Sequence, residues 1–267
     1  MAKKEINHES TSLQQLRDKI GWLTTSVQLA IAALKMCNRY TKHAKDQEQM
    51  LYENFELDPT IYDKLNQPVK QYEPLEILVQ HKQVHAALGQ LYEFFSNYLH
   101  DIIDEIEKYK PENMLRLLTK KQLKEFSLAL PQIQSLGNME RIQKAVLEQY
   151  FCKLRQTQHT QELYKKIVTH TQITIESHTS WCALGFLTLR NLLVHNKGIL
   201  DASFVRDYKG IFDGRIMKKI ITNKEVPLDI EVFQQACSAI FALCKEMDMQ
   251  LIANDLIKSR LTKKDPS

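Results

Sequence analysis

Residues that interrupt helices are scarce in this chain, and this is the sequence feature that most restricts the folds it can adopt. The 267 residues include only 7 glycines and 7 prolines, and the stretches between them are rich in Leu, Gln, Lys, Glu and Ala, which favour the α-helix. No stretch alternates apolar and polar residues for long enough to indicate an extensive sheet. With 43% hydrophobic and 25% charged residues, the chain can bury a core. We therefore predict an all-α fold.

Apolar residues three to four positions apart predict several long helices. The predicted helices cover residues 10–46, 75–109, short pieces of 112–130, 139–195 with a break near 157–161, and 230–257. Three prolines indicate a connecting segment over 47–74. A loop-rich insertion is expected over 199–229, before the last helix, with room for a short strand in 215–223.

This pattern predicts three parts of the chain. Residues 1–74 supply a long N-terminal helix and the connecting segment, which we expect to pack on the bundle. Residues 75–258 form the helical domain. The tail, 259–267, is expected to fray because it is polar and follows the last apolar position.

The cysteines and the N-terminal residues favour a cytoplasmic protein. The five cysteines are an odd number, form no CxxC pair and lie in apolar, helical surroundings, so we expect them to pack as small hydrophobic residues. They are Cys37, Cys152, Cys182, Cys237 and Cys244. The N-terminal residues lack the apolar region of a signal peptide, and no uninterrupted apolar run reaches the length of a membrane span. We expect no membrane partner.

Motifs for the common cofactors and metals are missing from the sequence. It contains no glycine-rich phosphate loop and no GxSxG elbow, so we predict no cofactor. His81 and His85 would share a helix face, as zinc ligands do, but the intervening residues lack the glutamate of HExxH and no third ligand is near. We therefore expect surface or packed histidines and no metal site.

The positive charge is concentrated in one window. Residues 190–224 hold eight Lys or Arg and three Asp, a net charge of +5, whereas the whole chain carries +4. The remainder of the chain is therefore slightly negative. A local basic field attracts polyanions, nucleic acids above all, although a solvated basic surface with no partner would have the same composition.

The start of that window is the end of a helix that is apolar on nearly every side. Over 181–198 the apolar residues surround Arg190, Asn191 and His195, and Gly198 supplies a helix stop. A helix that is apolar all round is expected to be buried all round. An arginine in such a place needs an anion, a cleft or an acidic partner. His195 also suits a structural role, because a cation near a helix C-terminus interacts favourably with the helix dipole.

The segment RNLLVH, residues 190–195, resembles the R-x4–6-H motif of the HEPN superfamily, which has a polar residue directly after the arginine. The context RNxxVHNxGixD, followed by a basic loop-rich segment and a last apolar helix, strengthens the likeness, which covers residues 75–257. This resemblance implies a HEPN-like helical bundle. It also implies, in active members, a metal-independent endoribonuclease in which two motifs face each other across a homodimer.

The resemblance assigns chemical roles to individual residues. His195 would act as general acid or base, because imidazoles titrate near neutral pH. Arg190 would bind phosphate oxygens with its bidentate fork. Asn191 would position His195 or bind the phosphate, and Lys197 would contact the RNA backbone. The expected setting is a toxin–antitoxin or anti-phage defence system, with RNA as substrate and an antitoxin or defence protein as a possible partner.

Two other interpretations remain open at this stage. In the first, the chain is a catalytically silent HEPN-like module that binds a nucleotide, nucleic acid or protein through Arg190. In the second, it is a helical assembly subunit in which Arg190 and His195 only pair and cap. Cleavage of RNA that depends on His195 separates the nuclease from both.

Overall fold

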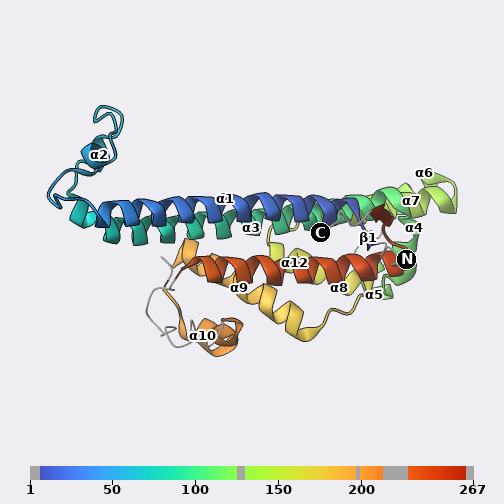
Figure 1. Ribbon diagram of the computed structural model, residues 1–267. Coiled ribbons are helices and arrows are strands. Elements are labelled where there is room, and N and C mark those ends of the chain that lie inside the picture. The colour runs from blue at the N-terminus through green and yellow to red at the C-terminus, as the bar shows by residue number, and fades with distance from the viewer. Residues whose placement is uncertain (1–6, 125–129, 197–198, 213–227, 263–267) are drawn as a thin grey trace, which may run out of the picture. The chain divides into compact units, whose positions relative to one another are not determined.

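A computed structural model describes residues 7–124, 130–196, 199–212 and 228–262, and confirms the predicted all-α fold with its long N-terminal helix (Figure 1). The α-helices are α1 (Thr11–Lys42), α2 (Leu51–Asn54), α3 (Tyr72–Tyr109), α4 (Glu112–Leu117), α5 (Lys120–Lys124), α6 (Leu130–Leu136), α7 (Met139–Arg155), α8 (Thr160–Thr171), α9 (Ser177–His195), α10 (Ala202–Tyr208) and α12 (Ile230–Ala253). Three 3-10 turns, η1 (Asp63–Leu65), η2 (Val69–Gln71) and η3 (Lys209–Ile211), complete the helical elements of the described residues.

The long helices contribute to two compact units. The first unit contains residues 1–19, 92–187 and 238–267, and the second contains 20–91 and 188–237. Both units consist of segments that are far apart in the sequence. The boundary divides α1, α3, α9 and α12, so that each of these helices belongs partly to one unit and partly to the other. The predicted division of the chain into 1–74, 75–258 and a tail stays a prediction.

The first unit has a core of aromatic and aliphatic side chains from several helices. Its most deeply buried residues include Phe95, Tyr98, Ile102, Tyr150, Phe151, Leu163, Phe186, Leu243 and Met247. The Tyr98 hydroxyl donates to the Cys244 carbonyl oxygen at 2.9 Å, and thus joins α3 to α12 inside this core. Burial raises the pKa of Tyr98 well above its usual value. The hydroxyl is therefore a neutral donor whose burial is balanced by its hydrogen bond.

The second unit pairs α1 with α3. Leu23, Val27 and Ile31 form the buried side of α1 in this unit, and Val84 and Leu88 are buried on α3. The Tyr72 hydroxyl donates to the Leu34 carbonyl oxygen at 3.0 Å, and the Asn38 amide donates to the Glu76 carboxylate. These two contacts tie the antiparallel helices together where their polar residues meet.

Two local features depart from the sequence prediction. The strand β2 (Arg260–Thr262) lies in the tail predicted to fray, and pairs antiparallel with β1 (Asn7–Glu9), so that His8 is opposite Leu261. The helical stretch 139–195 has its expected break between α7 and α8 but also a second one, between α8 and α9. This second break follows Gln172, which has a left-handed backbone conformation with φ of 55°. The strand suggested within 215–223 lies outside the described residues.

Apolar composition alone gives α1 the length and hydropathy of a membrane span. Only 22% of the most apolar 18-residue window is buried in the protein. These two criteria average over polar residues within the window, so they do not test the expectation of no uninterrupted apolar run, and the absence of a membrane partner stays a prediction. Cytoplasmic location stays a prediction.

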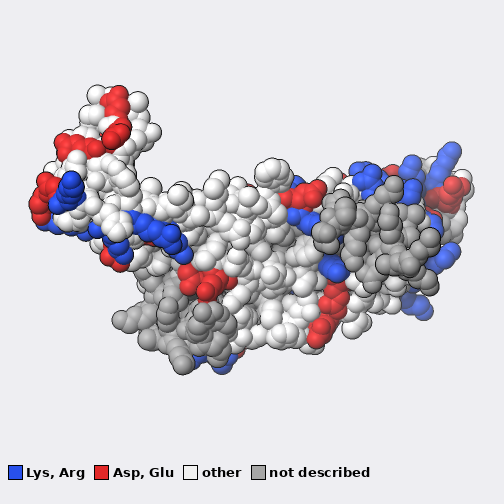
Figure 2. Space-filling model, in the orientation of Figure 1, with Lys and Arg blue, Asp and Glu red and all other residues white. Residues whose placement is uncertain are grey.

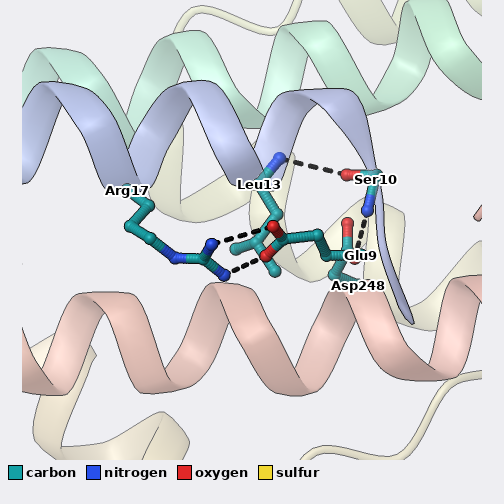
Figure 3. A network of polar contacts seen from close by, with 5 residues as sticks. All are labelled: Glu9, Ser10, Leu13, Arg17 and Asp248. Carbon is teal, nitrogen blue, oxygen red and sulfur yellow. Dashed lines mark hydrogen bonds and ion pairs between the residues drawn. The ribbon is translucent and has the colours of Figure 1, made fainter. Parts of the chain in front are cut away.

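A polar network fixes the start of α1 against α12 within the first unit (Figure 3). The Ser10 backbone N–H donates to Asp248 Oδ2 at 2.9 Å, and the Ser10 hydroxyl accepts from the Leu13 N–H at 3.0 Å, as an N-cap does. Glu9 is 2% exposed and forms an ion pair with Arg17 on the next turns of α1. The chain thus buries two carboxylates, Glu9 and Asp248, where α1 begins.

The ionised carboxylate of Asp248 destabilises the folded protein at neutral pH. Its side chain is fully buried, and its Oδ1 atom has no hydrogen-bond partner within the described structure. Burial raises the pKa of Asp248 from 3.8 to about 6; repulsion by Glu105 and Glu9 adds to the rise, and the hydrogen bonds from Ser10 oppose it. The folded protein therefore holds this proton at a pH at which the unfolded chain has already lost it.

Replacing Asp248 with Asn should remove a pH dependence of stability. In the wild type, the free energy of unfolding should fall by about 3 kcal/mol as the pH rises from about 3 to 7.5, because the folded pKa lies above the unfolded one. Urea denaturation across this pH range should show that the free energy of unfolding of Asp248→Asn, relative to that of the wild type, rises by the same amount. Asp18→Asn, on the exposed side of α1, is the matched control. A constant difference between Asp248→Asn and the wild type would contradict this role.

Candidate functional site

The candidate site lies on the last two turns of α9, in the second unit. Leu189 and Leu193 are buried there, whereas Arg190 and Asn191 are half-buried and Val194 is 48% exposed. The expectation that this helix is buried on every side is therefore wrong for its end. The helix packs through one face, and its polar residues lie at the edge of that face, where a long side chain can reach solvent.

Arg190 and Asn191 contact each other directly. Arg190 Nη1 donates to Asn191 Oδ1 at 3.3 Å. Neighbouring residues on a helix point about 100° apart, so the arginine stem bends toward the asparagine to make this bond. Asn191 thereby orients one edge of the guanidinium group, a contact that the sequence did not predict, since there Asn191 was assigned to His195 or to phosphate.

His195 lies one turn beyond Asn191 on the same face of the helix. The spacing i, i+4 brings their side chains to one side, whereas Arg190 and His195 are about 140° apart around the axis. His195 is exposed, and no hydrogen bond or ion pair reaches its imidazole from the described residues. The structure thus joins Arg190 to Asn191 and leaves His195 open to a ligand.

The residues that follow the helix hold its end in place. The Asn196 N–H donates to the Leu192 carbonyl oxygen, and the Asn196 side-chain amide donates to the Ile199 carbonyl oxygen at 2.8 Å. Asp201 caps α10 by accepting from the Phe204 N–H and from the Ser203 hydroxyl, both at 2.7 Å. These hydrogen bonds lower the pKa of Asp201.

In the string RNxxVHNxGixD, local hydrogen bonds that cap and terminate helices therefore explain the second asparagine, Asn196, and the aspartate, Asp201. A turn-and-cap pattern was readable in the sequence, since aspartate three residues before an apolar position is a typical N-cap. Leu200 and Phe204 are buried behind this turn and anchor it to the core.

The basic window is only partly described. Arg206 forms an ion pair with its neighbour Asp207, with 2.6 Å between Nε and Oδ1. Lys197, predicted to contact RNA, lies outside the described residues, as do Arg215, Lys218, Lys219 and Lys224.

The structure also shows where the cysteines and the histidine pair of α3 lie. Cys237 and Cys244 are buried, as predicted, and burial raises the pKa of Cys237 to about 11. The expectation that every cysteine packs as a small hydrophobic residue is wrong for Cys152, which is exposed. His81 and His85 are half-buried on α3. Across the described parts of the chain, no three His, Cys, Asp or Glu side chains lie together in a way that could hold a metal ion.

Comparisons with known protein families, with curated proteins and with solved structures find no match to this chain. The resemblance to the HEPN superfamily therefore depends on residues 190–201 and their context alone.

Loss of the Asp201 cap should weaken the turn beside the site. Asp201→Ala should lower the free energy of unfolding by about 1 kcal/mol, because the Phe204 N–H loses its acceptor. Asp201→Asn keeps an oxygen at this position and should stay within a few tenths of the wild type. Urea denaturation measures both, and hydrogen exchange at the Phe204 amide localises the effect. Equal stability of Asp201→Ala and the wild type would show that the cap is dispensable.

Proposed function

We propose that this protein is a HEPN-type, metal-independent endoribonuclease. The observation that carries the proposal is the arrangement at the end of α9, where Arg190 is bound to Asn191 and an exposed His195 follows on the same face as Asn191. A half-buried guanidinium group and an exposed imidazole would supply the two functions that metal-free RNA cleavage needs, namely phosphate binding and proton transfer.

The reaction is an internal transfer on the RNA. The 2′-hydroxyl oxygen bonds to the adjacent phosphorus and loses its proton, while the bond from phosphorus to the 5′-oxygen breaks and that oxygen takes up a proton. The products are a 2′,3′-cyclic phosphate and a 5′-hydroxyl. Imidazole serves as base or acid in these steps. The Arg190 fork stabilises the added negative charge on the non-bridging oxygens.

Asn191 has a positioning role in this scheme. Its Oδ1 accepts from Arg190 Nη1, which limits the rotation of a side chain that is otherwise long and flexible. An oriented fork binds a phosphate with a smaller loss of conformational entropy.

The wider setting follows from the same resemblance. A homodimer would place two Arg190–His195 pairs at one composite site, so that one imidazole acts as base and the other as acid. Lys197 would contact the RNA backbone. We place the protein in the cytoplasm, in a toxin–antitoxin or anti-phage role, with an antitoxin or defence protein as partner. The alternative is a silent HEPN-like module that binds RNA, a nucleotide or a protein without cleaving RNA.

Cleavage of RNA should depend on both residues and not on divalent metal. With EDTA present, His195→Ala should lower the cleavage rate by about 10²- to 10⁴-fold, as expected for loss of a general acid or base. Arg190→Lys should be nearly as impaired as Arg190→Ala, because lysine keeps the charge but not the fork. The assay follows a labelled RNA by gel and identifies the 2′,3′-cyclic phosphate ends by mass spectrometry.

Two surface variants control for general effects. His178→Ala removes another exposed histidine of α9, and Lys165→Ala removes an exposed cation of α8, outside the basic window. Both should keep wild-type activity. RNA binding with no cleavage by any form would support the silent module instead, and activity of His195→Ala equal to that of the wild type would refute the nuclease.

A further inference from the structure

The outer side of α1 carries a second apolar stripe. The stripe consists of Trp22, Ser26, Leu29, Ala33, Met36 and Tyr40, which are spaced alternately four and three residues apart and therefore lie in one row along the helix. Its large members are 76%, 70%, 69% and 58% exposed in chain order. The buried residues of α1 in this unit, Leu23, Val27 and Ile31, occupy the inner side.

This stripe is unusual for the solvent side of a helix. The outer face of an amphipathic helix is normally polar and charged, yet no charged residue occurs from Ile20 to Leu34. In Figure 2 the surface over the middle of α1 shows neither blue nor red. Single exposed apolar residues are common, but four large ones in one row, separated only by Ser26 and Ala33, indicate an interaction surface.

We propose that the stripe binds the same stripe of a second copy of this chain, with the two α1 helices antiparallel. In this arrangement Leu29 faces Ala33 and Met36 faces Ser26, so that each layer combines a large side chain with a small one. Trp22 faces Tyr40 at either end. Alternating large and small residues across facing positions gives interdigitated packing, and a two-fold axis uses the same surface on both copies.

Residues near the middle of the stripe favour close approach of the helices. Ala32 and Ala33 lie at the centre of the antiparallel pairing, near the two-fold axis, and both are exposed. Their small side chains allow the two backbones to come close at the axis. The bulky residues, Trp22 and Tyr40, are at the ends, where crossing helices diverge and leave more space.

A parallel pairing fits these residues less well. It would put Ser26 against Ser26 and Ala33 against Ala33, and these small layers leave cavities between the large ones. It would also bring Arg39 close to its own copy, with like charges opposed. The antiparallel pairing instead places Arg39 beside the uncharged residues 21–25 of the second copy.

The inner side of α1 argues against insertion into a bilayer. A spanning helix exposes all its sides to lipid or to other spanning segments, but Leu23, Val27 and Ile31 are buried within the second unit. Thr24 on that side also contacts the Cys237 sulfur at 3.9 Å. The spanning length of α1 therefore results from two apolar stripes on opposite sides of one helix.

The mass of the full-length protein in solution tests the inference. Light scattering during gel filtration should give a dimer or a higher even assembly, and Leu29→Lys should halve that mass, because a charge would be buried in the interface. Gln83→Lys, on the exposed side of α3, should leave the mass unchanged. Circular dichroism checks that each variant is folded. A monomeric wild type, or an unchanged mass of Leu29→Lys, would overturn the inference.

Cysteine cross-linking tests the direction of pairing. In a background with Cys37, Cys152 and Cys182 changed to Ser, a mixture of Ser26→Cys and Met36→Cys chains should form disulfides. Ser26→Cys alone should not, since its two copies would be about 15 Å apart along the axis, beyond the reach of a disulfide. Cross-linking of Ser26→Cys alone would establish a parallel pair and overturn the proposal.

Two further measurements separate pairing through α1 from an effect of α9 and from membrane binding. Arg190→Ala should keep the wild-type mass, because α9 has no part in this contact, so that failure of the nuclease proposal and failure of this one are distinguishable. The wild type should not sediment with phosphatidylcholine vesicles. Vesicle binding that Leu29→Lys abolishes, with no change in mass, would assign the stripe to a membrane surface and overturn the proposal.

Discussion

Burial of one apolar face along each long helix is the constraint on which the rest of the structure depends. In the second unit, Val27 and Ile31 of α1 and Leu88 of α3 are nearly inaccessible to water. Once these faces are buried, a polar group can stay between the helices only with a hydrogen-bond partner. Glu76 is 6% exposed and meets this condition, because it accepts from Asn38 and from Gln80. The polar contacts thus follow from the apolar packing and fix its register.

The same constraint explains which parts of the fold could be predicted from the sequence. Helical periodicity is local, so the long helices and the start of α7, where Asn138 caps the Arg141 N–H, follow from nearby residues. The pairing of β1 with β2 could not be predicted. It joins three-residue segments near residues 8 and 261, which are too short for a pattern. The burial of Asp248 was hidden for a similar reason, because it depends on Ser10 from a distant part of the chain.

The candidate site was predictable in its residues but not in its geometry. Sequence alone places Arg190, Asn191 and His195 on the final turns of one helix, because the winding angle is fixed. It could not give the bond from Arg190 to Asn191, since a long side chain can take many rotamers and its surroundings select one. It also overestimated the burial of the helix end. Which side of α9 is covered depends on helices elsewhere in the chain, and Val194 lies on the side that stays open.

The two sides of α1 show why composition alone does not indicate whether a helix is surrounded by water, lipid or protein. Hydropathy averaged along the helix adds the inner residues, such as Val27, to the outer ones, such as Leu29, and the total matches that of a membrane span. Burial separates the two contributions, since Val27 is 4% exposed and Leu29 is 70% exposed. The inner stripe is fully accounted for by the fold of the second unit. Packing among the described residues leaves the large side chains of the outer stripe exposed. A second copy of α1 would remove the free-energy cost of exposing them to water.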